Sequence, residues 1–327
     1  MEQATFSAPT WYRLYALFVI AVTAVLIWWG AAVTTENVGM AVPDWPLSFG
    51  TINPKGWWLV PALRLEHGHR VIASFVGLLT IGLAVGAWLG TKSSILRKTS
   101  LIAVGLVILQ GVLGGLRVIH ISDEFGIIHG CLGQSFFCVL ILIFLMAHRW
   151  EKTLVVDPGQ ERWIRRGACL SFGAIFLQLV FGAILRHTQR FHLADDSVIL
   201  TGDSWFPGFA SPDLLILFLH KWWAVVVTMI LLVFGTWAAR RVPPLRIYVL
   251  PLGVAVCLQV VLGIMVILTG KSFWITNIHV LNGLALLAGA FVLLVQSLRA
   301  VPSGNPAVPT SKRELDPLPM AAGRGSI

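Results

Sequence analysis

The chain has 327 residues, of which 57% are hydrophobic and only 12% are charged, and its formal net charge is +9. Its mean hydropathy is +0.81, and its charged fraction is roughly half of the about 25% that soluble domains carry. This composition excludes a disordered chain, a coiled coil, a collagen and a small disulfide scaffold. The charges lie between apolar runs instead of on one basic face, so no nucleic-acid partner is expected. The sequence indicates a polytopic membrane protein.

Eight apolar runs are long enough to cross a membrane as helices, which requires about 20 residues each. Charged residues mark their limits, and the runs are 14–33, 71–91, 99–116, 125–147, 167–185, 214–239, 247–270 and 272–298. Helices are expected because backbone groups in hydrocarbon must pair within their own segment. The runs also lack the alternating polarity of membrane β-strands. The predicted fold class is therefore an all-α membrane protein with eight transmembrane helices, surrounded by membrane lipids.

The distribution of Lys and Arg predicts the orientation, because cytoplasmic loops are enriched in these residues. With the N-terminus in the cytoplasm, 16 of the 24 Lys and Arg residues fall on the cytoplasmic side and 8 on the other. Both termini are thus expected to be cytoplasmic. The first run lacks a small-residue cleavage site and no Arg-rich transit peptide is visible, which favours a bacterial plasma membrane. Residues 301–327, rich in Pro, Gly, Ala and charge, are predicted to be disordered.

The two halves of the chain share landmarks at an offset of about 150 residues. The pairs are His69 with His220, Gln110 with Gln259, His129 with His279, and Gly30 with Gly182. Such self-similarity predicts two four-helix repeats, 1–150 and 151–300, followed by the tail 301–327. Four helices is an even number, so both repeats have the same orientation, and we expect a pseudo-two-fold axis along the membrane normal. The two glutamines are expected to form interhelical hydrogen bonds.

The four histidines of these pairs are candidate metal ligands, because ionisable groups within membrane helices are functional candidates. A simpler interpretation is that each histidine bonds a loop carbonyl at the membrane interface. Two repeat-related pairs at matched depth favour ligation, since two facing imidazoles bind haem iron. The expected pairs are His69 with His129 and His220 with His279. Zinc or copper would normally add Cys or carboxylate ligands. The four cysteines lie within the apolar runs, so no disulfide is expected either.

One carboxylate distinguishes the first repeat from the second. Glu66 lies three residues before His69 and shares a helix face with it, whereas Leu217 occupies the equivalent place in the second repeat. The alternative is a carboxylate that favours a helix start and pairs with Arg70. Arg70 and Lys221, which follow the first histidine of each pair, are candidate partners of haem propionates, or else interfacial anchors.

At residues 12–298 the chain resembles the haem A synthase family. The matching features are Glu66-x-x-His69-Arg70, the loop Val42-Pro43-Asp44-Trp45-Pro46, Gln110 with Leu113-Gly114, His129, Arg186-His187-Thr188, His220 and His279. The resemblance implies a haem A synthase, an oxidoreductase that converts the C8 methyl group of haem O to a formyl group. The product, haem A, would serve terminal oxidases.

The resemblance also implies roles for the candidate residues. His69 and His129 would be axial ligands of the substrate haem O, with Glu66 as the catalytic carboxylate. His220 and His279 would hold the iron of a haem b cofactor. Methyl oxidation needs proton removal and stabilisation of a developing cation, and both suit Glu66. The implied supplier of the substrate is a haem O synthase, a farnesyltransferase; the electron acceptor stays unknown and a homo-oligomer stays open.

The chain departs from the family in its first outer loop. Many bacterial relatives carry a cysteine pair there, whereas Val42 and Ser48 occupy that region in this chain. The sequence therefore looks closer to the cysteine-free type, and no thiol redox role is expected in the loop.

Two other functions are compatible with the residues alone. A dihaem b-type quinol electron carrier would hold two equivalent haems and would not need Glu66. A haem transporter or assembly chaperone would grip its cargo only transiently. A carboxylate in one half argues against the carrier, and a fixed second histidine pair argues against the transporter. Composition and spacing by themselves predict two bis-histidine sites in a duplicated bundle.

Overall fold

The computed structural model describes residues 8–148, 154–188, 197–202, 204–209 and 211–303. Eight long helices dominate it, which confirms the predicted fold class. In chain order they are α1 (Thr10–Thr35), α2 (Pro61–Gly90), α3 (Ser94–His120), α4 (Asp123–Ala147), α5 (Gln160–His187), α6 (Pro212–Arg241), α7 (Arg246–Leu268) and α8 (Phe273–Ser297). Short 3-10 helices, η1 (Trp57–Leu59) and η3 (Pro243–Leu245), precede α2 and α7.

Most helices extend a few residues beyond the apolar runs that predict them. The largest difference is in α2, which begins at Pro61, whereas the predicted run begins at residue 71. Counting apolar residues stops at a charge, but a helix continues through charged residues as long as its backbone bonds are made. Proline suits the first helical position because its missing N–H would have no partner there. Glu66 and His69 therefore lie well inside α2.

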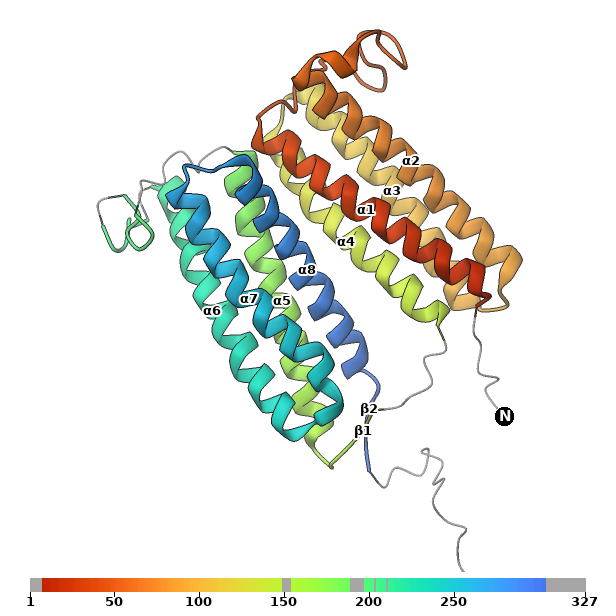
Figure 1. Cartoon of the computed structure of the whole chain (residues 1–327), viewed down its shortest axis with the longest axis vertical. Coiled ribbons are helices and arrows are strands. Elements are labelled where there is room, and N and C mark those ends of the chain that lie inside the picture. Colours follow the sequence, from red (N-terminus) through yellow and green to blue (C-terminus); the bar gives the residue numbers. More distant parts are fainter. Residues whose placement is uncertain (1–7, 149–153, 189–196, 203, 210, 304–327) are drawn as a thin grey trace, which may run out of the picture.

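Figure 1 shows two bundles side by side, one of α1–α4 and one of α5–α8. α1 packs on α8, and α4 packs on both α5 and α8, so these four helices form the junction between the bundles. The α1–α2 and α5–α6 connections lie at one end, here called the loop end, and the described N-terminal residues lie at the other, the terminal end (Figure 1). The repeat boundaries and the two-fold axis stay predictions.

A small parallel sheet at the terminal end joins the link between the bundles to the C-terminal segment (Figure 1). It consists of β1 (Leu154–Val156) and β2 (Ala300–Pro302). Arg165 of α5 donates to the Ala300 carbonyl at 2.9 Å. Residues 301 and 302, which the sequence assigns to a disordered tail, thus form the end of a strand. Residues 304–327 of that predicted tail lie outside the described residues.

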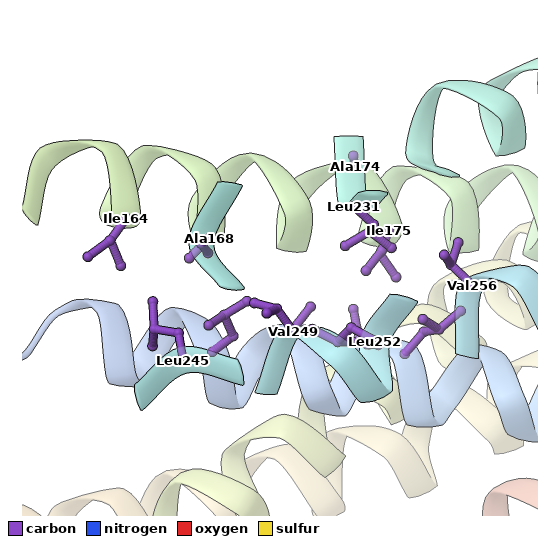
Figure 2. Close-up of a cluster of buried hydrophobic side chains, with 14 of the residues drawn as sticks. Ile164, Ala168, Ala174, Ile175, Leu231, Leu245, Val249, Leu252 and Val256 are labelled. Carbon is purple, nitrogen blue, oxygen red and sulfur yellow. The ribbon is translucent and has the colours of Figure 1, made fainter. Parts of the chain in front are cut away.

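Each bundle has a large apolar core, and a smaller apolar cluster of α4 and α8 side chains joins the two. In the second bundle, buried side chains of α5, α6 and α7 converge toward α8, among them Ile164, Ile175, Leu231, Val249 and Val256 (Figure 2). Between 11% and 39% of the residues in each membrane-spanning window are buried. Large apolar side chains such as Val254, which is 72% exposed, cover the outside of the bundles. Such a surface is stable against lipid, and the chain is a multi-pass membrane protein.

Candidate functional site

The four predicted histidines occupy matching positions in four helices. His69 and His220 each lie eight residues after the proline that begins α2 or α6, and His129 and His279 each lie six residues after the first residue of α4 or α8. All four helices begin at the loop end (Figure 1). The structure therefore places the four side chains at a similar depth, within the first three turns from the loop end.

In the first bundle, His69 and His129 face each other. Their ring centroids are 6.4 Å apart and their planes are inclined at 75°. Two nitrogen ligands of one first-row metal ion lie about 4 Å apart, because each bond is about 2 Å long, so this separation leaves room for one ion. His129 Nδ1 donates to the Gln110 carbonyl at 3.1 Å, a bond that fixes the orientation of a ligating ring. His69 Nδ1 is buried without a partner in the described part of the chain.

In the second bundle, His220 and His279 lie within electrostatic range of each other. Gln178 of α5 donates to the His220 carbonyl at 3.0 Å and contacts its Nδ1 at 3.2 Å. Gln259 of α7 donates to the His279 carbonyl at 3.1 Å and contacts its Nε2 at 3.2 Å. Glutamines thus brace both histidine turns from the preceding helix.

Gln110 makes the corresponding bond in the first bundle, donating to the His129 carbonyl at 3.0 Å. The interhelical bonds expected of Gln110 and Gln259 are confirmed. Gln178 was not foreseen, because its counterpart in the first repeat, Leu26, is apolar and gives the repeat comparison no signal.

A glycine of the preceding helix lies against each of the four rings. A Cβ placed on Gly30, Gly114, Gly182 or Gly263 would lie 2.9, 3.3, 3.1 or 3.3 Å from Cε1 of His69, His129, His220 or His279. Such distances are tighter than ordinary van der Waals contact, so a side chain at these positions would displace the ring. The glycines let each helix pair pack closely around its histidine, and they form a cradle suited to a flat macrocycle.

These features fit a haem in each bundle. Iron in a haem takes its in-plane ligands from the macrocycle and needs only axial side chains from the protein. Among the described residues, no group of three or more His, Cys, Asp and Glu side chains is placed to hold a metal ion. Pairs of histidines beside small residues are therefore the donor set present here, and this set suits haem iron better than zinc.

Among the described carboxylates, Glu66 is the one within a helical turn of a histidine of either pair. Its side chain is buried, with the residue 5% exposed. Oε1 accepts from Arg70 at 2.9 Å, and Oε2 accepts from the backbone N–H of Ala41 at 3.2 Å. Leu217, at the equivalent place in α6, is also 5% exposed. The two bundles thus differ in chemistry at one matched, buried position.

The two predicted propionate partners contact the outer connections. Arg70 donates to the carbonyls of Asp44, Leu47 and Val42 at 2.6, 3.0 and 3.0 Å. Lys221 donates to the carbonyls of Ser197 and Leu200 at 2.9 and 2.7 Å. Each cation therefore anchors the connection that precedes its own helix, and a propionate role for either one stays a prediction.

His67, the neighbour of the candidate ligand His69, lies outside the histidine pair. Its Nδ1 is 2.9 Å from Ser48 Oγ and its ring packs on Trp57 at a centroid distance of 4.9 Å. It supports the α1–α2 connection, as expected for a residue on another face of α2.

The sequence interpretation did not assign a role to three basic residues at the junction of the bundles. Arg117 lies in the last turn of α3, and Arg186 and His187 lie in the last turn of α5. Arg186 donates to the Ala31 carbonyl at 2.8 Å and to Thr35 Oγ1 at 3.0 Å, which ties α5 to α1. The sequence shows charged residues at the ends of apolar helices, but it does not indicate which residues they contact.

Three relatives of the chain share the name heme A synthase. It is 28% identical over 271 residues to the heme A synthase of Halalkalibacterium halodurans, covering 77% of this chain and 85% of that protein. It is 29% identical over 268 residues to the heme A synthase of Shouchella clausii, covering 79% and 86%. It is 27% identical over 289 residues to the heme A synthase of Geobacillus thermodenitrificans, covering 83% and 86%.

The family profile of COX15-CtaA, described as cytochrome oxidase assembly protein, matches residues 63–291. The matched region begins in α2 and ends in α8, and it includes all four histidines and Glu66. Because the match spans well over half of the sequence, the chain belongs to the COX15-CtaA family of cytochrome oxidase assembly proteins.

Proposed function

We propose that this chain is a haem A synthase of a bacterial cytoplasmic membrane. Its reaction would be oxidation of the C8 methyl group of haem O to a formyl group, in which water supplies the oxygen atom and the released electrons pass to an external acceptor. The proposal is supported by the family match and by relatives named heme A synthase. The observation that carries it is the buried Glu66 beside the His69–His129 pair, with Leu217 in its place beside the second pair. A site that only transfers electrons has no need of a base.

The two pairs have different tasks in this proposal. His69 and His129 hold the substrate haem O, and His220 and His279 hold a haem b. When bound, haem b supplies a redox centre through which electrons leave the substrate site toward an external acceptor. The glutamines bonded to the backbone of His220 and His279 hold these ligands in place on both sides. The second pair is therefore suited to a permanent cofactor.

Glu66 receives a proton released as the methyl carbon is oxidised. Its two oxygens each accept one hydrogen bond, from Arg70 and from Ala41. An ionised carboxylate offers about four lone-pair positions, so acceptor capacity is left for a proton or a polarised C–H group. The negative charge also stabilises a cation that develops on the substrate. Arg70 is a positioning residue, because it fixes the carboxylate and the connection above it.

The α1–α2 connection closes the first bundle at the loop end. Arg70 bonds three of its carbonyls, and the Ala41 N–H of the same segment bonds Glu66. With both termini in the cytoplasm, this connection faces the outside and limits access of water to the substrate. A haem O synthase in the same membrane would deliver haem O to this site.

Production of haem A tests the proposal directly. The chain is produced together with a haem O synthase in a host that lacks haem A, and extracted haems are separated by chromatography. Haem A in the extract is the expected result. Folded, haem-loaded protein that yields only haem b and haem O, with a working electron acceptor in the membrane, would contradict the proposal and favour a carrier or a chaperone.

A further inference from the structure

Three basic residues of two different bundles meet at the loop end of the junction. A Cβ placed on Gly126 of α4 would lie 2.7 Å from His187 Nδ1 and 3.0 Å from Arg117 Nε, so these two groups flank the same point. Arg186 precedes His187 in the last turn of α5 and also bonds α1. We call Arg117, Arg186 and His187 the junction cluster.

Each member of the junction cluster has a buried nitrogen without a partner in the described part of the chain. These nitrogens are Arg117 Nε, Arg186 Nη1 and His187 Nδ1. A buried donor nitrogen that lacks a hydrogen-bond partner is costly and is rarely retained without a reason. Three such nitrogens at one junction indicate that an acceptor beyond the described residues completes the site.

Of the described carboxylates, the two within electrostatic range of Arg117 do not supply that acceptor. Glu66 is within electrostatic range of Arg117, but it is already paired with Arg70 at 2.9 Å. Asp123, also in range of Arg117, is an exposed residue in the first turn of α4. Arg117 and Arg186 are half-buried cations, and among the described residues the one buried carboxylate is Glu66, so the acceptor that fits is an anion.

The cluster lies next to the histidine pairs. Arg117 is within electrostatic range of both His69 and His129, and Arg186 is within range of His279. His187 packs on Gly126 and Gly130 of α4, the helix that carries His129. Arginine binds carboxylates through two parallel hydrogen bonds. The cluster is therefore close enough to bind an anionic group of a molecule that His69 and His129 hold.

We propose that the junction cluster binds a propionate carboxylate of the haem held by His69 and His129. This inference rests on the proposed function for the identity of the ligand. It assigns the carboxylate to the junction instead of to Arg70, whose donors already hold loop carbonyls. Because Arg117 lies in α3 and the other two members lie in α5, the bound carboxylate also links the two bundles.

The test compares iron protoporphyrin IX with its dimethyl ester, in which both propionates are uncharged. The full chain is loaded with either compound, and release to a haem scavenger is followed by absorbance. Wild-type protein is expected to release the ester about tenfold faster or more, which is the effect of losing charge-assisted hydrogen bonds. Arg117→Met is expected to speed release of the free acid by a similar factor and to leave release of the ester unchanged.

Matched variants separate binding from folding. Arg64→Met removes an exposed cation from the first turn of α2, at the loop end. This variant should leave both release rates unchanged. His187→Phe keeps an aromatic ring packed against α4 but removes the ring nitrogens. It should reduce the preference for the free acid over the ester. If Arg117→Met does not fold, His187→Phe carries the test alone. Release of both compounds at equal rates from wild-type protein would overturn the proposal.

Two further conditions of the same experiment test whether the cluster binds a different anion. Release is measured in phosphatidylcholine vesicles with and without phosphatidylglycerol, and with inorganic phosphate added. The preference for the free acid should persist in all conditions. A preference that phosphate or anionic lipid abolishes, or an Arg117→Met effect equal for acid and ester, would assign the cluster to another anion or to packing. None of these readouts requires haem A, so this proposal and the proposed function fail separately.

Discussion

The two bundles share a frame but differ in the groups placed on it. In both, an even-numbered helix carries each histidine, a glycine of the preceding helix lies against each ring, and a glutamine braces the second histidine of the pair. The first bundle then has Glu66 where the second has Leu217, and Leu26 where the second has Gln178. The first bundle thus has a buried carboxylate at a matched position, and the second has a further glutamine brace. In the proposed function, this difference separates a site for chemistry from a site that retains a cofactor.

The largest expected effect comes from removing the reactive group of the first bundle. Glu66→Gln keeps the size of the side chain but removes its charge and most of its basicity. Haem A formation should fall by on the order of a hundredfold or more, while both bundles still bind haem. The measurement is extraction and chromatography of haems from cells that also make haem O. Glu124→Gln, at an exposed position in the first turn of α4, is the control. A normal yield of haem A in Glu66→Gln would remove Glu66 from the mechanism.

The second bundle should respond differently to loss of its own group. His279→Ala removes one axial ligand of the proposed haem b, so the low-spin absorption of that haem should be lost from the purified protein. Haem A formation should fall with it, because electrons then lack their exit. His148→Ala, just after α4 where His148 bonds the Phe144 carbonyl and packs on the Phe144 ring, should keep the spectrum. Retention of the low-spin spectrum in His279→Ala would contradict the assignment of the pair.

Glycine substitutions test the frame that both bundles share. Gly182→Ala places a methyl group about 3.1 Å from Cε1 of His220, so the ring must move. The affinity for haem b should fall about fivefold or more, because overpacking costs about 1–3 kcal/mol. Haem b occupancy of the purified protein should fall with it. Gly173→Ala, on the same helix with open space around it, should leave occupancy unchanged. Equal haem content in both variants would show that the glycine contact does not position the ligand.

The sequence was a good guide wherever a feature repeats. His69 and His220, or His129 and His279, are recognisable because each residue has a counterpart at a fixed offset, and the structure gives each pair matching places. Gln178 was not foreseen because its counterpart is Leu26. The contacts of Gly114 and Gly263 were not foreseen either, since glycine is common in membrane helices and marks no particular neighbour.

The junction cluster and the anchors of the outer connections depend on packing that the sequence does not encode locally. Arg117 and His187 come from helices of different bundles, and only the approach of α5 to α4 brings them to one point. Arg70 and Lys221 looked available for a ligand because the path of the connections was unknown. In the folded chain, carbonyls of residues 42–47 accept hydrogen bonds from Arg70. Charge alone predicts that a partner exists, and the fold decides which one.

The smallest expected effect concerns the α1–α2 connection, in which the Ala41 N–H bonds the carboxylate of Glu66. Within it, Asp44 accepts the backbone N–H groups of Gly50 at 2.8 Å and Phe49 at 2.7 Å. These bonds, that of Gly50 first, and the nearby Arg70 charge hold the pKa of Asp44 below its ordinary value. A carboxyl group with a lowered pKa stabilises the folded loop fully above the unfolded pKa of about 3.9, and this contribution is lost as the pH falls through the lower, folded pKa.

Acid should therefore loosen this connection before it affects the helices. The measurement is the rate of pepsin cleavage within residues 36–60 between about pH 4 and pH 2, a range that spans the titration of a carboxyl group. Wild-type protein should become more susceptible as the pH falls, relative to Asp44→Asn, whose side chain cannot titrate and whose loop is loose throughout. The ratio of the two rates cancels the pH dependence of the protease itself. A ratio that stays constant across this range would show that Asp44 does not hold the connection, and Arg70 would then be its main anchor above Glu66.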